Sequence, residues 1–177
     1  MYTIEEFEKS MKKSLIGFAE FCIQDGDISP HAFLVTTKKF ETGEYLKEPE
    51  VIVIATLDEF NEDGKDVFVE AIKKMAERTG AIGAAFLSEA WLVTASSTTE
   101  AKKFGSLGNH PNRRDTVLIT FDHIAYPVGT GKMLSAEITA VEGKRVIGEF
   151  TDFGLNKSSG RFCGLLDFAK NKNGATA

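Results

Sequence analysis

The first 25 residues carry the pattern that most restricts the fold, an apolar stripe that only a long amphipathic helix can place on one side. Its apolar residues recur at spacings of three and four: Ile4, Phe7, Met11, Leu15, Phe18 and Cys22. Thr3 and Glu6 have the form of a capping box, in which each side chain accepts a hydrogen bond from the other residue's backbone N–H. We therefore predict a helix from this box to about Asp25-Gly26, packed on a flat layer that is a β-sheet.

Beyond this helix, apolar runs typical of strands follow one another along the chain. We predict strands at 31–37, 51–57, 81–95, 115–123, 132–141 and 145–151, and further helices at about 67–76 and 162–169. The run VIVIATL at 51–57 has no polar alternation, which is typical of a central strand covered on both faces.

The order of these elements, α-β-β-α-β-β-β-β-α, decides the fold class. Adjacent strands favour antiparallel pairing, while the helix between the second and third strands predicts one right-handed crossover. We predict an α+β fold with a single mixed, mainly antiparallel sheet of about six strands and two or three helices packed mainly on one face. Residues 1–177 fit a single globular domain, because a chain of this length can bury roughly 70% of its unfolded surface.

Charge and cysteine content narrow the class of protein. The net charge of −5 comes from acidic residues spread along the chain, which disfavours a large nonspecific nucleic-acid interface. The N-terminus reads as a charged helix rather than a signal peptide, and Cys22 and Cys163 lie far apart, so we predict a cytoplasmic protein with buried, unpaired thiols. No apolar run approaches the roughly 20 residues needed to cross a bilayer, so we predict no membrane contact.

The residue types that bind metals or phosphate lack the required spacing. His31, His110 and His123 stand in three separate segments, and the sequence has neither a zinc-deaminase signature nor a pair of closely spaced histidines. The motif GTGK at 129–132 has Met133 where a phosphate-binding loop needs Ser or Thr, which favours a hairpin turn. We predict no metal and no cofactor.

The stretch SEAWLVTAS at 88–96 places a carboxylate inside an apolar strand. Alternate side chains share a face, so Glu89 and Trp91 lie on the same side of the strand. A buried carboxylate needs a donor, and the polar segment that follows ends in Arg113 and Arg114. We predict that one of these arginines binds Glu89 bidentately and that Trp91 is largely buried; the alternative is a Glu89 at a sheet edge in water.

The 96–115 segment is the longest stretch with no predicted helix or strand. Segments of more than about 12–15 such residues inside a compact domain are usually functional or mobile. The sequence therefore predicts ligand or partner binding at the two ends of this segment, by Trp91, Arg113 and Arg114. The candidates for catalysis, if the chain is an enzyme, are Glu89, His110 and Asp115.

A resemblance rests on the same residues. SEAW at 88–91 is followed about twenty residues later by HPNRRD at 110–115, then by VLITF at 117–121 and GRF at 160–162. This set resembles a group of uncharacterised bacterial and phage proteins that pair a SEAW-like strand with a P-x-R-x-E-like segment, over roughly residues 80 to 166. No established activity comes with the resemblance, which implies a site at Glu89, Trp91, Arg113 and Arg114. Asp115 stands where the group has Glu, so an acidic side chain is kept with a shorter reach.

Three functions are compatible with these residues. We favour a noncatalytic cytoplasmic binding or regulatory domain that uses the 96–115 segment, because no complete catalytic constellation is visible. Its partner would be a protein or a small anionic ligand. The first alternative is a hydrolase-like enzyme with Glu89 or Asp115 as base, His110 as acid or base, and one of the arginines holding an anionic substrate. The second is nucleic-acid binding through the two arginines and Lys102-Lys103.

Overall fold

The computed structural model describes residues 2–39, 41–55, 62–93, 97, 99–100, 103–105, 109–157 and 162–174. Along the chain the elements are α1 (Ile4–Asp25), β1 (His31–Lys38), β2 (Tyr45–Ala55), α2 (Glu62–Thr79), β3 (Gly83–Leu92), β4 (Arg114–His123), β5 (Thr130–Val141), β6 (Lys144–Ile147), β7 (Thr151–Lys157) and α4 (Asp167–Gly174). The predicted α+β class is confirmed, and among these elements β6 and β7 replace the last predicted strand.

The seven strands form one sheet in which every described pairing is antiparallel. The strand order is β2-β1-β3-β4-β5, and the far edge of β5 is shared by β7 and β6. The connection through α2 runs from β2 to β3, which both pair with β1, so the crossover joins strands that are not neighbours. β2 is therefore an edge strand. The prediction of a central strand at 51–57 is wrong for the residues that the structure describes, where Val51 and Val53 are about half exposed.

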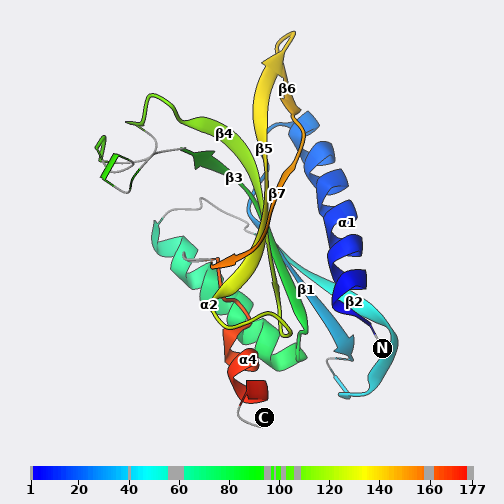
Figure 1. The fold of residues 1–177 in the computed structure, drawn as a ribbon. Helices are drawn as coiled ribbons and strands as arrows, with labels where there is room; N and C mark the ends of the chain where they lie inside the picture. The colour runs from blue at the N-terminus through cyan, green and yellow to red at the C-terminus, as the bar shows by residue number, and fades with distance from the viewer. Residues whose placement is uncertain are drawn as a thin grey trace.

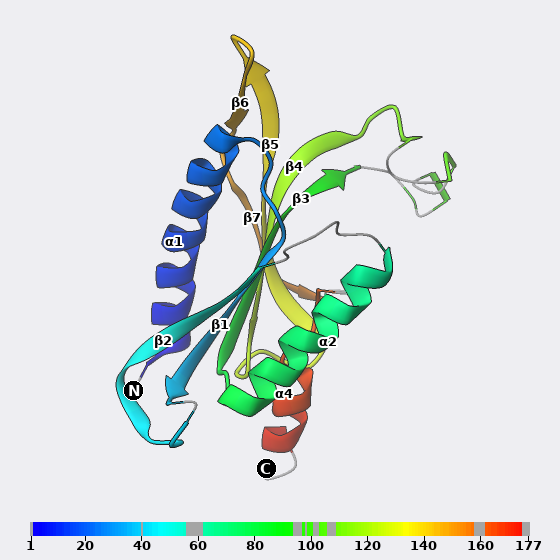
Figure 2. The same cartoon turned by 180° about the vertical axis from the view of Figure 1, so that it is seen from behind.

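Helices cover both faces of the sheet, whereas the sequence predicted them mainly on one face; that prediction is wrong (Figure 1). α1 packs over buried side chains of β1, β3, β4 and β5. α2 and residues 162–168 pack on the opposite face, as the view from behind shows (Figure 2). Alternate side chains of β3 point to opposite faces of the sheet. Leu87 packs in the cluster under α1, and Phe86 packs in the cluster under α2.

The local sequence accounts for α1. Thr3 Oγ1 accepts a hydrogen bond from the Glu6 N–H at 3.2 Å, and Glu6 Oε2 accepts one from the Thr3 N–H at 2.7 Å, so the predicted capping box is confirmed. Three residues of the predicted stripe, Phe7, Met11 and Leu15, are buried. In the second half of the helix the buried residues are Ala19 and Ile23, each one position after the predicted Phe18 and Cys22, which are only partly buried. None of the helices in the described part of the chain combines the length and the apolar character needed to span a membrane.

A long hairpin carries β6 back along β5 toward the C-terminal end of α1 (Figure 1). Its turn has positive φ at both central residues, 50° at Glu142 and 77° at Gly143, which is the type I′ geometry that matches the twist of paired strands. In the register after the turn, Arg145 pairs with Ala140. The hairpin therefore places Arg145 beside the residues that follow α1.

Candidate functional site

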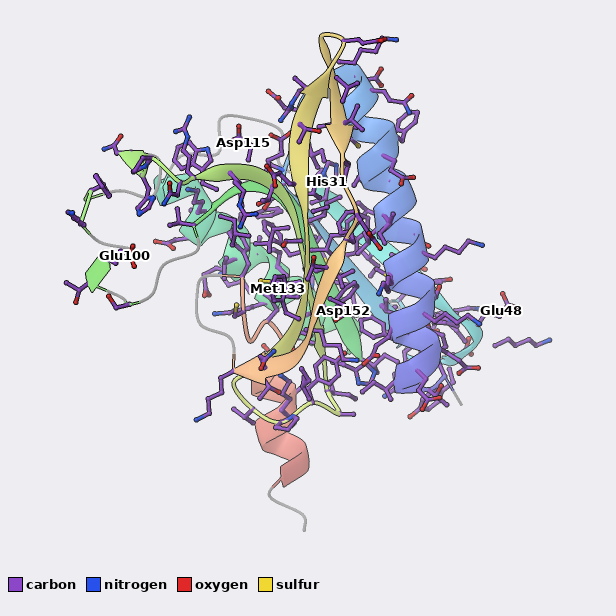
Figure 3. The ribbon with its side chains drawn as sticks, turned by 45° about the horizontal axis from the view of Figure 1, so that its top comes forward. His31, Glu48, Glu100, Asp115, Met133 and Asp152 are labelled. Atoms are coloured by element: carbon purple, nitrogen blue, oxygen red, sulfur yellow. The ribbon has the colours of Figure 1, made fainter. Side chains whose placement is uncertain are left out.

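Four of the residues predicted for a site lie near the paired ends of β3 and β4: Glu89, Trp91, Arg114 and Asp115. Trp91 pairs with Asp115, and Leu92 pairs with Arg114. Paired residues point to the same face of a sheet, so Trp91 and Asp115 lie on the α1 face with Glu89, whereas Arg114 lies on the opposite face. Figure 3 shows Asp115 toward the end of the sheet from which the β5–β6 hairpin projects.

Glu89 is held by an arginine that the sequence analysis did not consider. Its Oε1 accepts hydrogen bonds from Arg145 Nη1 at 3.0 Å and from the Ile28 N–H at 2.7 Å, and its Oε2 accepts one from Arg145 Nη2 at 2.6 Å. Arg145 also donates to the Gly26 carbonyl at 2.9 Å and pairs with Asp27. The hydrogen bonds to Glu89 raise the pKa of Arg145 above its ordinary value. The carboxylate thus joins β3, β6 and the α1–β1 connection.

The predicted bidentate arginine exists, but its predicted identity is wrong. Arg114 projects from the face opposite Glu89 and lies 3.6 Å from Glu137, on the neighbouring strand β5. Arg113 lies over the ring of Trp91. Neither Arg113 nor Arg114 is therefore the partner of Glu89. The alternative of a Glu89 in water is also wrong, since only 26% of its side chain is exposed.

We expect Glu89→Gln to destabilise the fold by about 2 kcal/mol, because the new amide would turn an N–H donor toward the donors of Arg145. A double-mutant cycle of this change with Arg145→Met, read by urea unfolding, should give a coupling of at least about 1 kcal/mol. The matched control pairs Glu89→Gln with Arg114→Met, and those effects should add within about 0.5 kcal/mol. Equal coupling of Glu89 to Arg145 and to Arg114 would contradict the assignment of Arg145 as the partner of Glu89.

Trp91 is 51% exposed, so the prediction that it is buried is wrong. α1 covers β3 as far as Leu87, and Glu89 already contacts Ile28, which follows the end of the helix. Trp91 lies one step further along the same face, beyond this cover. The guanidinium carbon of Arg113 lies 5.1 Å from the centre of the indole, within the range of a cation–π contact.

The exposure of Trp91 has a direct spectroscopic consequence, because this is the only tryptophan of the chain. We expect iodide to quench its emission in the native protein nearly as well as in the urea-unfolded chain, and Arg113 should concentrate the anion near the ring. Acrylamide, which is uncharged, serves as the control, and Arg113→Ala should lower iodide quenching more than acrylamide quenching. Emission that iodide reaches only after unfolding would show that the ring is covered.

His110 is buried and lies edge-on to Phe104, with 4.8 Å between the ring centres. Its Nδ1 accepts a hydrogen bond from the Asn112 N–H at 3.1 Å. Among the described residues, no hydrogen bond or ion pair joins His110 to Glu89 or to Asp115. The three candidates for acid–base catalysis are therefore not linked to one another by hydrogen bonds in the described part of the structure.

The remaining predicted groups are dispersed. His31 on β1, His110 and His123 on β4 stay in separate places, and the described part of the chain contains no group of three His, Cys, Asp or Glu side chains that could hold a metal ion. Cys22 and Cys163 are unpaired and partly buried, and burial raises the pKa of the Cys22 thiol. Lys102 lies outside the described residues, while Lys103 Nζ lies 5.8 Å from the centre of the neighbouring Phe104 ring.

The surface that results is an exposed indole with one cation and one carboxylate beside it. We call Trp91, Arg113 and Asp115 the Trp91 platform. Such a surface can stack on a flat group and can offer a hydrogen-bond donor and an acceptor at its rim. Comparison of the chain with protein-family models, with curated proteins and with solved structures found no match.

Proposed function

We propose that the chain is a noncatalytic binding domain whose contact surface is the Trp91 platform, at the base of the 96–115 segment. The observation that carries the proposal is a half-exposed tryptophan with an arginine guanidinium over its ring, at cation–π distance. Tryptophan and arginine are enriched among the residues that contribute most to protein–protein binding. Asp115 beside the ring offsets the charge of Arg113, which favours a protein partner over a small anionic ligand.

The chemistry of Glu89 supports a noncatalytic role. A general base needs a lone pair that can reach a substrate, whereas this carboxylate already accepts three hydrogen bonds, two of them from Arg145. Nucleic-acid binding finds little support, because the net charge is −5 and Arg113 and Arg114 stand beside Asp115 and Glu137.

We place the protein in the cytoplasm as part of the same proposal. Two unpaired cysteines are typical of a reducing compartment. The likeness of SEAW and HPNRRD to uncharacterised bacterial and phage proteins stays a prediction about origin, and it adds no activity.

The test replaces Trp91 by a photo-crosslinking amino acid in cells of the native host. Val128, which is 53% exposed and lies away from the platform, carries the same amino acid in the control. We expect a protein adduct at position 91 that position 128 does not give. The purified partner should then bind the Trp91→Ala and Arg113→Ala variants about tenfold more weakly than the native chain, and Val128→Ala equally well. Identical adducts at both positions, or unchanged affinities, would refute the proposal.

A further inference from the structure

The sheet has a free edge at β2. Among the described strands β2 pairs only with β1, so its other side lies at the margin of the sheet (Figure 2). The two halves of β2 differ in composition. Residues 45–50 contain two glutamates, a lysine and Pro49, which are residues that discourage a further strand from pairing. Residues 51–55, with the sequence VIVIA, contain no charge and no proline, so this half of the edge is unprotected.

The unprotected half presents backbone N–H and C=O groups. The Val35 carbonyl on β1 accepts a hydrogen bond from the Ile82 N–H at 2.8 Å, so the backbone groups of Val35 point toward β3. Val51, the partner of Val35 on β2, therefore belongs to a non-hydrogen-bonded pair and points its own N–H and C=O away from β1. The same holds for Val53 and Ala55, two and four residues further on. Water or another strand must bond these groups.

The side chains of the same residues make the edge apolar. Val51 and Val53 are 50% and 54% exposed. They lie on the α1 face, because their partners on β1, Val35 and Phe33, belong to the cluster under α1. Phe18 of α1 packs edge-on to Phe33 and leaves Val53 half exposed beside it. A further strand would therefore gain both backbone hydrogen bonds and apolar contacts here.

The sequence of this half fits a second copy of the same strand. When two copies run antiparallel with Val53 opposite Val53, the apolar residues 51–55 face only one another. The residues with free backbone groups also face one another, so each N–H meets a C=O. A pairing centred on Val51 or on Ile52 would instead bring Pro49, which has no N–H, into the ladder.

The opposite edge of the sheet does not offer a matching apolar strand. Its strands β6 and β7 carry charged side chains, among them Lys144, Arg145, Asp152 and Lys157. Pairing of β2 with its own copy also closes after two chains about a two-fold axis, whereas pairing of unlike edges would continue into a filament.

We propose that β2 is the interface of a homodimer, in which two copies of the chain pair antiparallel through residues 51–55, centred on Val53. The sheet then continues from one copy into the other. β1 lies between β2 and the strand that carries Trp91, so this interface does not include the Trp91 platform. Because the contact is confined to one short stretch of strand, the dimer is weak, with an expected Kd of about 10 µM.

The test measures the mass of the full chain by sedimentation equilibrium. At about 100 µM the native chain should approach twice its monomer mass of 19.4 kDa. Val53→Lys places two like charges at the two-fold axis and should weaken dimerisation at least about tenfold. Val141→Lys changes a similarly exposed valine on β5 and should leave dimerisation unchanged.

Disulfide crosslinking tests the register, in a chain whose two native cysteines are replaced by alanine. Val53→Cys should give a disulfide-linked dimer on mild oxidation, because the Cα atoms of directly opposed residues lie about 5.5 Å apart. Val51→Cys should not, because it lies opposite Ala55 of the second copy and about 13 Å along the strand from its own counterpart. A native chain that is monomeric at about 100 µM would exclude the dimer. A dimer that Val53→Lys leaves intact, or a disulfide at position 51 in place of position 53, would exclude this interface.

Discussion

Replacing Lys170 by methionine should destabilise the protein by about 3 kcal/mol at neutral pH, because it leaves the Asp122 carboxylate buried without its counter-charge. The Lys170 ammonium lies 2.6 Å from Asp122 and 2.9 Å from Asp167. The side chains of Lys170 and Asp122 are only 2% and 6% exposed. Asp122 Oδ2 also accepts a hydrogen bond from the Leu166 N–H at 2.8 Å, so this pair fastens α4 and the segment before it to β4.

The deficit of Lys170→Met should depend on pH in a defined direction. Burial raises the pKa of Asp122, while the hydrogen bonds from Lys170 and Leu166 oppose that rise. Without Lys170 the pKa in the folded state rises further above the unfolded value of about 3.9. A carboxyl with a raised pKa favours the folded state below the unfolded pKa, and this contribution is lost as pH rises through the folded pKa. The deficit should therefore be small near pH 4 and should grow toward pH 8.

Two further variants separate charge burial from loss of packing. Asp122→Asn added to Lys170→Met removes the stranded charge and keeps an oxygen for the Leu166 N–H, so it should recover most of the lost stability and abolish the pH dependence. Lys12→Met breaks an exposed ion pair with Asp152 and should change the free energy of unfolding by less than about 1 kcal/mol. A Lys170→Met effect no larger than that of Lys12→Met in urea unfolding would mean that α4 is not held by this pair.

The features that the sequence predicts correctly are those decided within one segment. The capping box of Thr3 and Glu6 and the apolar stripe after it define α1 without reference to the rest of the chain. The positions of most strands follow from runs of apolar residues, but β7 was not predicted, because its sequence TDFGLNK is not such a run. Whether a strand is central or at the edge of the sheet does not follow from such a run. VIVIA at 51–55 is apolar at every position, and yet β2 lies at the edge. Its alternate residues Ile52 and Ile54 pack toward α2, and nothing local reveals that Val51 and Val53 stay half exposed.

The candidate site likewise has features that one segment decides and features that depend on the rest of the fold. Alternation along β3 correctly places Glu89 and Trp91 on one face, and the need for a donor correctly predicts a bidentate arginine. The identity of that arginine depends on how β5 and β6 bring Arg145 over the end of α1, which no local pattern encodes. The exposure of Trp91 likewise depends on where α1 stops covering β3. The sequence did not predict helices on both faces of the sheet. An apolar stripe indicates that a helix packs on the sheet, but it does not indicate on which face.

Replacing Gly83 by alanine should destabilise the fold by about 3 kcal/mol, because the ring of Phe7 lies directly against the backbone of this residue. A Cβ at position 83 would lie 2.7 Å from Phe7 Cδ2 and 2.9 Å from Cζ, and closer still to Cε2. The ring cannot retreat, since Phe7 is fully buried and packs edge-on to Phe121 and beside His123. The first residue of β3 is thus glycine so that α1 can approach the sheet.

A double-mutant cycle distinguishes this steric cause from an effect on strand propensity. Phe7→Leu removes the atoms in conflict and should itself destabilise by about 1–2 kcal/mol, but Gly83→Ala added to it should cost less than about 1.5 kcal/mol. Gly17→Ala, at an exposed position of α1 with open space around it, should stabilise by about 0.5–1 kcal/mol. Strictly additive effects of the Gly83 and Phe7 changes would instead place the cost in the backbone of β3, since a contact between two side chains must couple them.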